Sequence, residues 1–542
     1  MAPTEDCGWL LYISLAAKCG GEPYRVLGFI AVLLAACVVT ALLHWASPGG
    51  AAWGAYRWTR RGLGIGQACI PGPRGFPVIG SMGLMTGLAH RKLALAASGD
   101  DRRRRLMAFS LGDTRMVVTA DPDVARDLLA SPAFADRPVK ESAYGLMFHR
   151  AIGFAPYGAY WRTLRRVASS HLFSPRQVGS SAAQRATIAR QMVDAMELGA
   201  SAGGVVEARR FLKRASLHNV MWSVFGRRYE LEAVSEEAAE LRSLVDEGYD
   251  LLGQLNWSDH LPWLARFDLQ KTRSRCSALV PRVNRFVRQI IDEHRAAAGA
   301  DADAGMDFTD VLLSLQGSDK LSDGDMIAVL WEMIFRGTDT VAVVIEWVLA
   351  RLVMHQDVQA RVHQELDRVV GPEKAVTESD AASLVYLQAV IKEVLRLHPP
   401  GPLLSWARLA TSDVHVGGFL VPAGTTAMVN MWAITHDPAV WTDAAEFKPD
   451  RFLAGPSRDH AAAEFSITGS DLRLAPFGSG RRSCPGKSLA IATVGFWVAT
   501  LLHEFEWMPP SDGRGVDLSE VLRLSCEMAA PLEARLRPRR AL

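Results

Sequence analysis

The feature that most constrains the fold of this chain is an uncharged apolar segment close to its N-terminus. From Val26 to Ala46 the sequence reads VLGFIAVLLAACVVTALLHWA, without Asp, Glu, Lys or Arg. As a helix this segment would measure about 31 Å, enough to cross the hydrocarbon layer of a bilayer. We therefore predict a transmembrane anchor over residues 24–46, with Tyr24 and Trp45 at the two interfaces. A cleaved signal peptide is the alternative, but its apolar region is usually shorter.

The charges that flank this segment predict its orientation. Basic and acidic residues are mixed before it, whereas only basic residues follow it as far as Asp100. The basic residues are Arg57, Arg60, Arg61, Arg74, Arg91 and Lys92. Because positive charge stays in the cytosol, we expect residues 1–23 to be a short lumenal N-terminus and the rest of the chain to be cytosolic. The triplet Asn256-Trp257-Ser258 is then a glycosylation signal that is never used.

The remaining chain is predicted to form one large globular unit. Residues 47–80 are basic and rich in Pro and Gly, and Pro71–Pro77 can form neither a helix nor an interior strand. No long linker divides residues 81–542, and 49% hydrophobic residues supply a sizeable core. The formal net charge of +2 gives no case for a nucleic-acid partner.

Helical patterns dominate this unit, so we predict a mainly α fold with a small β region. Residues 106–111 and 116–119 read as a strand pair. Ser322 is a candidate N-cap for a helix that continues without proline to about Met354 and is apolar around its circumference. A second helix is predicted from Ala381 to Leu397, where Pro399 and Pro400 stop it.

One cysteine lies in a setting suited to chemistry. The loop Phe477–Gly486 reads FGSGRRSCPG and is followed by the apolar run Leu489–Leu502. Pro485 is a favourable first helical residue, so Cys484 should lie at a helix N-terminus, where free N–H groups favour thiolate over thiol. An inert buried cysteine is the alternative, which the neighbouring basic and glycine residues disfavour. Zinc is disfavoured because no second Cys or His stands at ligand spacing.

This loop fits F-x-x-G-x-R-x-C-x-G and resembles the haem-binding loop of the cytochromes P450. The resemblance implies that Cys484 is the axial ligand of the iron of haem b (iron protoporphyrin IX), a thiolate that favours O–O cleavage. Gly480 and Gly486 would let the backbone bend around sulfur and porphyrin. Arg482 would pair with a haem propionate, and Phe477 would shield the sulfur from water.

A second motif lies midway along the long predicted helix. Arg336-Gly337-Thr338-Asp339-Thr340 resembles the oxygen-activation stretch of the same family. Thr340 could bond to the carbonyl of residue 336 and bend the helix around an O₂ pocket. Thr340 and Asp339 would then relay protons into that pocket. A kinked helix with a satisfied threonine is the alternative, and the cysteine loop decides between them.

Arg336 departs from the family pattern, which usually has a small residue at this position. Since it lies one turn before Thr340, it could share the face that points to the pocket. One hypothesis is that it binds an acidic group of the substrate. The favoured alternative is an ion pair with Glu332, four residues earlier.

Supporting positions match the family elsewhere. Glu393, Arg396 and Arg451 would form a buried ion network with a structural role. Trp161 and Arg165 match the helix whose side chains reach the haem propionates, and Arg408 and His436 are weaker candidates for the same contact. The glycines at 62, 64 and 66 follow no strand, so electrons from NADPH would have to enter through a partner protein.

The phrases WEMIFRGTDT, HPPGPLLSWARLAT, NMWAITHD and LRLAPFGSGRR also resemble family 78 subfamily A of plant cytochromes P450. This resemblance implies an endoplasmic-reticulum anchor in membrane lipid, NADPH–cytochrome reductase as the electron donor, and a role in organ or seed growth and in leaf initiation. The chain is thus expected to be a monooxygenase that inserts one oxygen of O₂ into a small apolar molecule, with fatty-acid-like molecules as the candidate class. A haem-thiolate isomerase or dehydratase and a non-enzymatic haem carrier or sensor are the rivals, and Asp339-Thr340 speaks against both.

Overall fold

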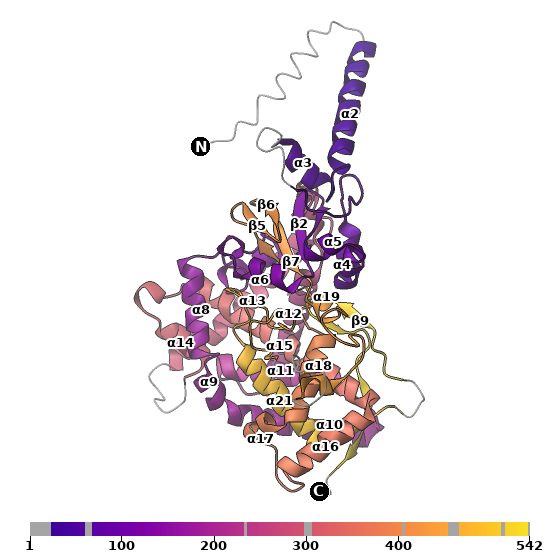
Figure 1. Cartoon of the computed structure of the whole chain (residues 1–542). Helices are drawn as coiled ribbons and strands as arrows, with labels where there is room; N and C mark the ends of the chain where they lie inside the picture. The colour runs from indigo at the N-terminus through magenta and orange to yellow at the C-terminus, as the bar shows by residue number, and fades with distance from the viewer. Residues whose placement is uncertain are drawn as a thin grey trace.

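The computed structural model describes residues 23–59, 68–231, 236–297, 306–403, 407–453, 465–510 and 515–539. The predicted lumenal segment, the side chain of Tyr24 and the glycines at 62, 64 and 66 lie outside the part that is described. Within these ranges the molecule is mainly helical, with four small sheets, as the sequence predicts (Figure 1).

The N-terminal helix α2 (Pro23–Trp45) projects from the body (Figure 1). Its span Val26–Trp45 is long and apolar enough to cross a membrane, and none of it is buried within the protein. The helix α3 (Ala51–Thr59) follows directly and packs on the body, which the sequence did not predict. Trp53 of α3 is 2% exposed and donates its indole N–H to the carbonyls of Phe109 and Met116.

The body is built around α15 (Asp323–Met354), which begins where the sequence predicts. The hydroxyl of its N-cap, Ser322, accepts a hydrogen bond from the backbone N–H of Asp325. Helices α11, α13, α18 and α21 pack against α15 (Figure 1). Gly337 allows the close approach of α11, since a Cβ there would lie 2.4 Å from Val220 Cγ2.

The other long helices complete the body. They are α8 (Ala159–His171), α10 (Ala182–Gly203), α11 (Ala208–Phe225), α12 (Glu236–Gly253), α13 (Thr272–Ala297), α16 (Gln356–Val369), α18 (Val385–Leu397) and α21 (Lys487–Glu504). Shorter helices include α4 (Ala89–Ala97), α5 (Asp101–Arg105), α6 (Pro122–Ala130), α7 (Glu141–Gly145), α9 (Pro175–Ser180), α14 (Phe308–Ser314), α17 (Glu378–Ser383) and α19 (Met431–Thr435).

The largest sheet has the strand order β1-β2-β7-β4. Its strands are β1 (Met107–Leu111), β2 (Thr114–Thr119), β7 (Thr426–Val429) and β4 (Arg408–Leu409). The predicted strand pair is present as the antiparallel hairpin β1–β2, in which Met107 faces Val118. Strand β2 runs parallel to β7, and β4 pairs antiparallel to β7.

Three smaller sheets do not pair with the strands of this one. They are β5 (Val414–Val416) with β6 (Phe419–Val421), β9 (Glu520–Leu522) with β10 (Cys526–Met528), and β3 (Val206–Glu207), β11 (Glu533–Pro538) and β8 (Phe505–Met508) in the order β3-β11-β8. The hairpin β9–β10 reaches the central cavity, because Ser525 lines it.

Two helix boundaries differ from the prediction. The helix expected over 381–397 is divided at Leu384 into α17 and α18, because Thr377 starts α17 with a capping box that fixes an earlier first turn. Helix α21 begins at Lys487 with Gly486 as its N-cap, so Pro485 lies in the turn before the helix. Cys484 therefore stands three residues ahead of α21, not at its first turn.

Candidate active site

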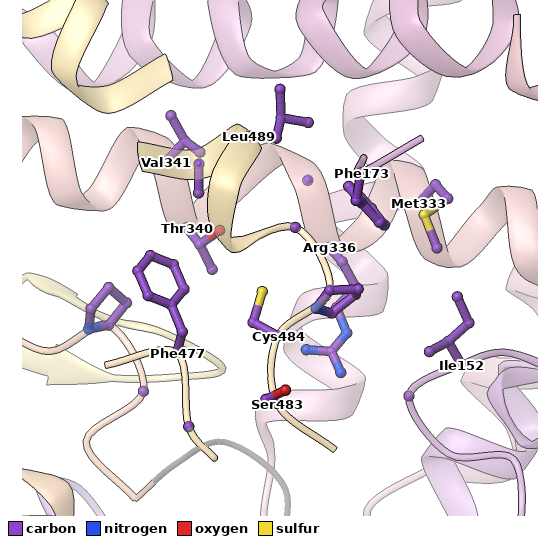
Figure 2. Close-up of a pocket in the computed structure, with 18 of the residues that line it drawn as sticks. Ile152, Phe173, Met333, Arg336, Thr340, Val341, Phe477, Ser483, Cys484 and Leu489 are labelled. Carbon is purple, nitrogen blue, oxygen red and sulfur yellow. The ribbon is translucent and has the colours of Figure 1, made fainter. Parts of the chain in front are cut away.

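A central cavity of about 320 Å³ brings the two sequence motifs together. Helix α15 contributes Arg336 and Thr340, and the cysteine loop contributes Phe477 and Cys484 (Figure 2). The Cys484 side chain points from its loop toward the α15 side of the cavity, where the Thr340 hydroxyl is exposed (Figure 2). Residues 144 positions apart in sequence thus face one space.

The cysteine loop is fixed by contacts to the end of α6. Gly480 has φ +71°, and a Cβ there would lie 2.0 Å from the carbonyl oxygen of Leu129. Arg481 donates to the carbonyl of Ala130 at 2.7 Å, and the Cys484 N–H donates to the Phe477 carbonyl at 2.9 Å. Gly480 therefore allows the loop to pack closely against the end of α6. A Cβ on Gly486 would lie 3.2 Å from the ring of Phe173, which also lines the cavity.

The Cys484 thiol is not favoured as a thiolate by the protein alone, contrary to the argument from a helix N-terminus. Burial raises the pKa of the Cys484 thiol, and the lowering effects of the Gly486 N–H and of the Arg336 and Arg165 charges do not cancel it. A thiol that coordinates a metal ion is deprotonated outright, so a bound iron would supply the missing positive charge.

Arginine side chains line one side of the cavity, and they outnumber the carboxylates near them. Burial, and next the charge of Arg482, lower the pKa of Arg408 to about 9. Burial likewise lowers the pKa of Arg482 to about 10, against the opposing effect of Asp136. Arg137 was not singled out from the sequence; burial and the charges of Arg408 and Arg482 lower its pKa well below the usual range. Nη1 of Arg408 is buried without a hydrogen-bond partner among the described residues.

These arginines fit haem, because the buried Nη1 of Arg408 has no hydrogen-bond partner among the described residues and a haem propionate would supply one. Arg482 is held by the carbonyls of Ala135, Ile152 and Ala155, and its guanidinium lies 4.4 Å from the Trp161 ring. Trp161 donates its indole N–H to the Ile152 carbonyl at 2.9 Å.

Two further propionate candidates differ in their placement. Arg165 lines the cavity and donates to the Ser483 hydroxyl at 3.5 Å. His436 is not among the cavity-lining residues; it stacks on Trp432 at 4.2 Å and contacts the Trp432 carbonyl, so its suggested role is not supported.

The oxygen motif lies on α15 without a break in the helix. The hydroxyl that bonds back to the preceding turn belongs to Thr338, which donates to the Ile334 carbonyl at 2.7 Å. The predicted bond from Thr340 to the carbonyl of residue 336 is absent among the described contacts, and the Thr340 hydroxyl faces the cavity instead. Asp339 does not line the cavity; its carboxylate pairs with Lys213 of α11 at 2.9 Å.

Arg336 lines the cavity and also makes the alternative contact predicted from the sequence. Its Nε lies 3.8 Å from Oε1 of Glu332. Glu332 is 3% exposed, accepts a hydrogen bond from the Gly153 N–H at 2.7 Å, and has its pKa raised by burial. The ion pair leaves the Arg336 side chain in the cavity wall, where its guanidinium lies near Cys484 (Figure 2).

Behind the cavity, Glu393, Arg396 and Arg451 are brought together as a buried network. Arg451 Nε donates to Glu393 at 3.1 Å, and Arg396 Nη1 donates to the carbonyls of Thr435 and Ala444. The side chains of Glu393 and Arg396 are fully buried.

A helical fold that places a cysteine loop opposite a long central helix, with buried arginines beside it, defines a haem-dependent monooxygenase. The model of the cytochrome P450 family matches residues 70–525, and the chain belongs to this family. It therefore uses haem as its cofactor and O₂ as a substrate.

Relatives are similar over the whole length. Cytochrome P450 78A9 of Arabidopsis thaliana is 61% identical over 544 residues, covering 100% of this chain and 99% of the relative. Cytochrome P450 78A3 of Glycine max is 59% identical and covers 99% of each chain. The trimethyltridecatetraene synthase of Zea mays is 38% identical, with 86% of this chain and 88% of the relative covered.

Proposed function

We propose that this protein is a membrane-anchored monooxygenase of a small, apolar, fatty-acid-like molecule, with Cys484 as the haem ligand. One oxygen atom of O₂ enters a C–H bond and the other leaves as water, with two electrons from NADPH and two protons. The observation that carries this proposal is the shared cavity of Cys484, Thr340 and the arginines.

The chain's own residues would hold the cofactor. Cys484 would bind the iron, and the propionates would accept hydrogen bonds from Arg408 and Arg482, with Arg137, Arg165 and Trp161 also in the cavity wall. The haem, when bound, supplies O₂ binding and cleavage. Phe477 lines the cavity beside Cys484 and would limit the access of water to the sulfur.

Thr340 and Asp339 would deliver the protons. The Thr340 hydroxyl is exposed to the cavity and can donate a proton there, while Asp339 lies next in sequence on the protein side of α15. Exchange of protons through a hydroxyl and a carboxylate is ordinary general acid–base chemistry.

Arg336 supports an acidic substrate. It places a guanidinium in a cavity whose lining also includes the apolar side chains of Ile152, Met333 and Val341. A carboxylate at one end of a hydrocarbon chain would satisfy both surfaces, and its contact with Arg336 would compete with the ion pair to Glu332. The relative named for trimethyltridecatetraene, a branched hydrocarbon chain, agrees with an apolar chain-like substrate.

The anchor, the partner and the biological role are also proposals. Residues 1–23 would be lumenal, 24–46 the span in the endoplasmic-reticulum membrane, 47–80 the connector and 81–542 the catalytic domain in the cytosol. Arg162 and Arg481, whose guanidiniums both lie over the Tyr157 ring, and Lys487, at the start of α21, carry positive charge on or near the cysteine loop, which suits an acidic NADPH–cytochrome reductase. Arg166 contributes less, because it pairs with Asp319 at 2.8 Å. A role in organ or seed growth and in leaf initiation is proposed from the resemblance to family 78 subfamily A, to whose members the chain is similar over its full length.

The test combines a spectrum with isotope incorporation. Reconstituted enzyme and reductase, given ¹⁸O₂ and a panel of plant lipids, should yield a product with one labelled oxygen. The carbon-monoxide complex should show the absorption band that gives the family its name, and Cys484→Ser should lose it. Retention of that band by Cys484→Ser, or product without label, would overturn the proposal.

A further inference from the structure

The acid of the oxygen motif belongs to a charge network that leads away from the cavity. Asp339 is 7% exposed, and its Oδ1 lies 2.9 Å from Nζ of Lys213. Nζ of Lys213 also lies 3.3 Å from Oε2 of Glu527, which is 5% exposed. One ammonium therefore contacts two buried carboxylates. Burial alone would lower the pKa of Lys213, but these two carboxylates raise it.

Glu527 connects this network to the cavity wall. It lies on β10, two residues after Ser525, which lines the cavity. The same strand is attached to α11 a second time, since Arg209 donates to the Met528 carbonyl at 2.7 Å. A ligand that presses on the hairpin β9–β10 would therefore act on Glu527 and on the way Lys213 divides its hydrogen bonds.

Other charged groups surround the network. Arg523, on the hairpin, lies 3.6 Å from Glu527, and Arg336 stands on α15 one turn before Thr340. From α12, Asp246 and Tyr249 face Asp339, whose charge, after burial, raises the pKa of both groups. Lys213 is the cation that contacts Asp339 directly among the described residues.

We propose that Lys213 is a positioning residue for the proton relay, which holds the Asp339 carboxylate on the protein side of α15 and divides its ammonium between Asp339 and Glu527 of the cavity-lining hairpin. The inference rests on the proposed function, because it assigns Asp339 to the relay. The hairpin thereby adjusts the position of the Asp339 carboxylate according to what the cavity holds.

Two substitutions should move the relay in opposite directions. Lys213→Met leaves two carboxylates facing each other, so the apparent pKa of product yield per NADPH should rise by about one unit or more. Glu527→Gln leaves the ammonium to Asp339 alone, so that apparent pKa should fall. If Lys213 had only a structural role, the two substitutions would leave the apparent pKa unchanged or would shift it in the same direction.

The experiment uses the full-length haem enzyme with reductase and dodecanoic acid as the probe. Product and hydrogen peroxide per NADPH are measured from pH 4 to 9, and hydrogen exchange of the peptide 520–528 is measured with and without the probe. Lys213→Arg should restore the pH profile, and Lys320→Met, on an exposed lysine, is the matched control. In Lys213→Met the peptide should exchange faster and lose its response to the probe.

The outcomes separate this inference from the proposed function. If Asp339→Asn leaves the product yield unchanged, the assignment of the relay fails. If Asp339→Asn lowers the yield while Lys213→Met and Glu527→Gln keep the wild-type pH profile, only the inference about Lys213 is overturned. Should Lys213→Met not bind haem, the isosteric Glu527→Gln still decides the question through the sign of its shift.

Discussion

Arg396 and Glu393 form a two-pronged ion pair that no solvent reaches. Nε and Nη2 of Arg396 each donate to a different carboxylate oxygen of Glu393, both at 2.8 Å. Arg451 adds a third donor to the same carboxylate. Two guanidiniums thus share one carboxylate, and their remaining N–H groups donate to backbone carbonyls, so the stability of each residue depends on the other two.

Glu393→Gln should therefore destabilise the protein strongly. The variant leaves two buried guanidiniums without their anion, which costs about 3–5 kcal/mol. Urea unfolding of the haem-loaded protein, followed by circular dichroism, should show the loss. Arg361→Gln, which removes a surface pair with Asp450, is the control and should cost less than about 1 kcal/mol. Equal effects of the two variants would contradict the role of the buried network.

Gly480→Ala should detach the cysteine loop from α6. Its Cβ would meet the Leu129 carbonyl at 2.0 Å, in addition to the strain of a positive φ. Gly478→Ala is a matched control, because Gly478 also has a positive φ, +68°, but open space around its Cβ. Haem content per chain should fall severely in the first variant and little in the second. If both retain haem equally, the contact with Leu129 is not what fixes the loop.

Arg408→Met should affect the haem-free and haem-loaded forms in opposite ways. Without haem, the substitution removes a buried charge whose Nη1 has no partner in the described part of the chain, so the free energy of unfolding should rise. With haem, it removes a propionate partner, and the dissociation rate of haem should increase about tenfold or more. Transfer of haem to a scavenging apoprotein measures that rate. A slower transfer from Arg408→Met would show that Arg408 does not hold the cofactor.

Thr340→Ala should separate electron use from product formation. Removing the cavity-facing hydroxyl leaves the haem pocket intact but interrupts the relay, so product per NADPH should fall by about 10²-fold while hydrogen peroxide accumulates. Thr340→Ser keeps the hydroxyl and should retain most of the yield. The same loss in both variants would mean that the methyl group of Thr340, through packing, is what matters.

Acid should destabilise the protein partly through His218. Burial, followed by the charges of Arg214 and Arg242, lowers the pKa of His218 to about 4. The unfolded chain, with a pKa near 6.5, binds more protons between pH 6.5 and 4, so stability falls as the pH decreases through that window. The contribution is at most about 3 kcal/mol. The free energy of unfolding of the wild type minus that of His218→Gln, measured from pH 7 to 4, should decrease as the pH falls. A difference that does not change with pH would contradict this.

Local sequence signals predicted the elements that depend on local contacts. The Ser322 cap, the proline-free run after it and the hairpin β1–β2 are short-range features, and each appears at or within three residues of the predicted place. The expectation for Cys484 came from the family motif of its loop, in which glycine permits and proline fixes the local backbone angles, and Cys484 does line the cavity.

Contacts between distant segments could not be predicted in this way. Arg137 joins the arginine cluster only because the fold brings it beside Arg408, and Lys213 meets Asp339 only because α11 packs on α15. The pKa of Cys484 was misjudged because the desolvation that raises it comes from the whole cavity, not from its sequence neighbours. Such effects belong to the packed molecule.

The way α3 is embedded also dictates where the chain can be shortened. Trp53 of α3 is buried against β1 and β2 and donates to the carbonyls of Phe109 and Met116. Trp45, at the end of α2, donates to the Gly75 carbonyl at 2.7 Å. Deleting everything up to residue 60 would remove Trp53 and expose the hairpin. A chain that starts just before Ser47 would lack the apolar helix α2 but keep α3, and with it Trp53. A soluble form of the protein should therefore begin there.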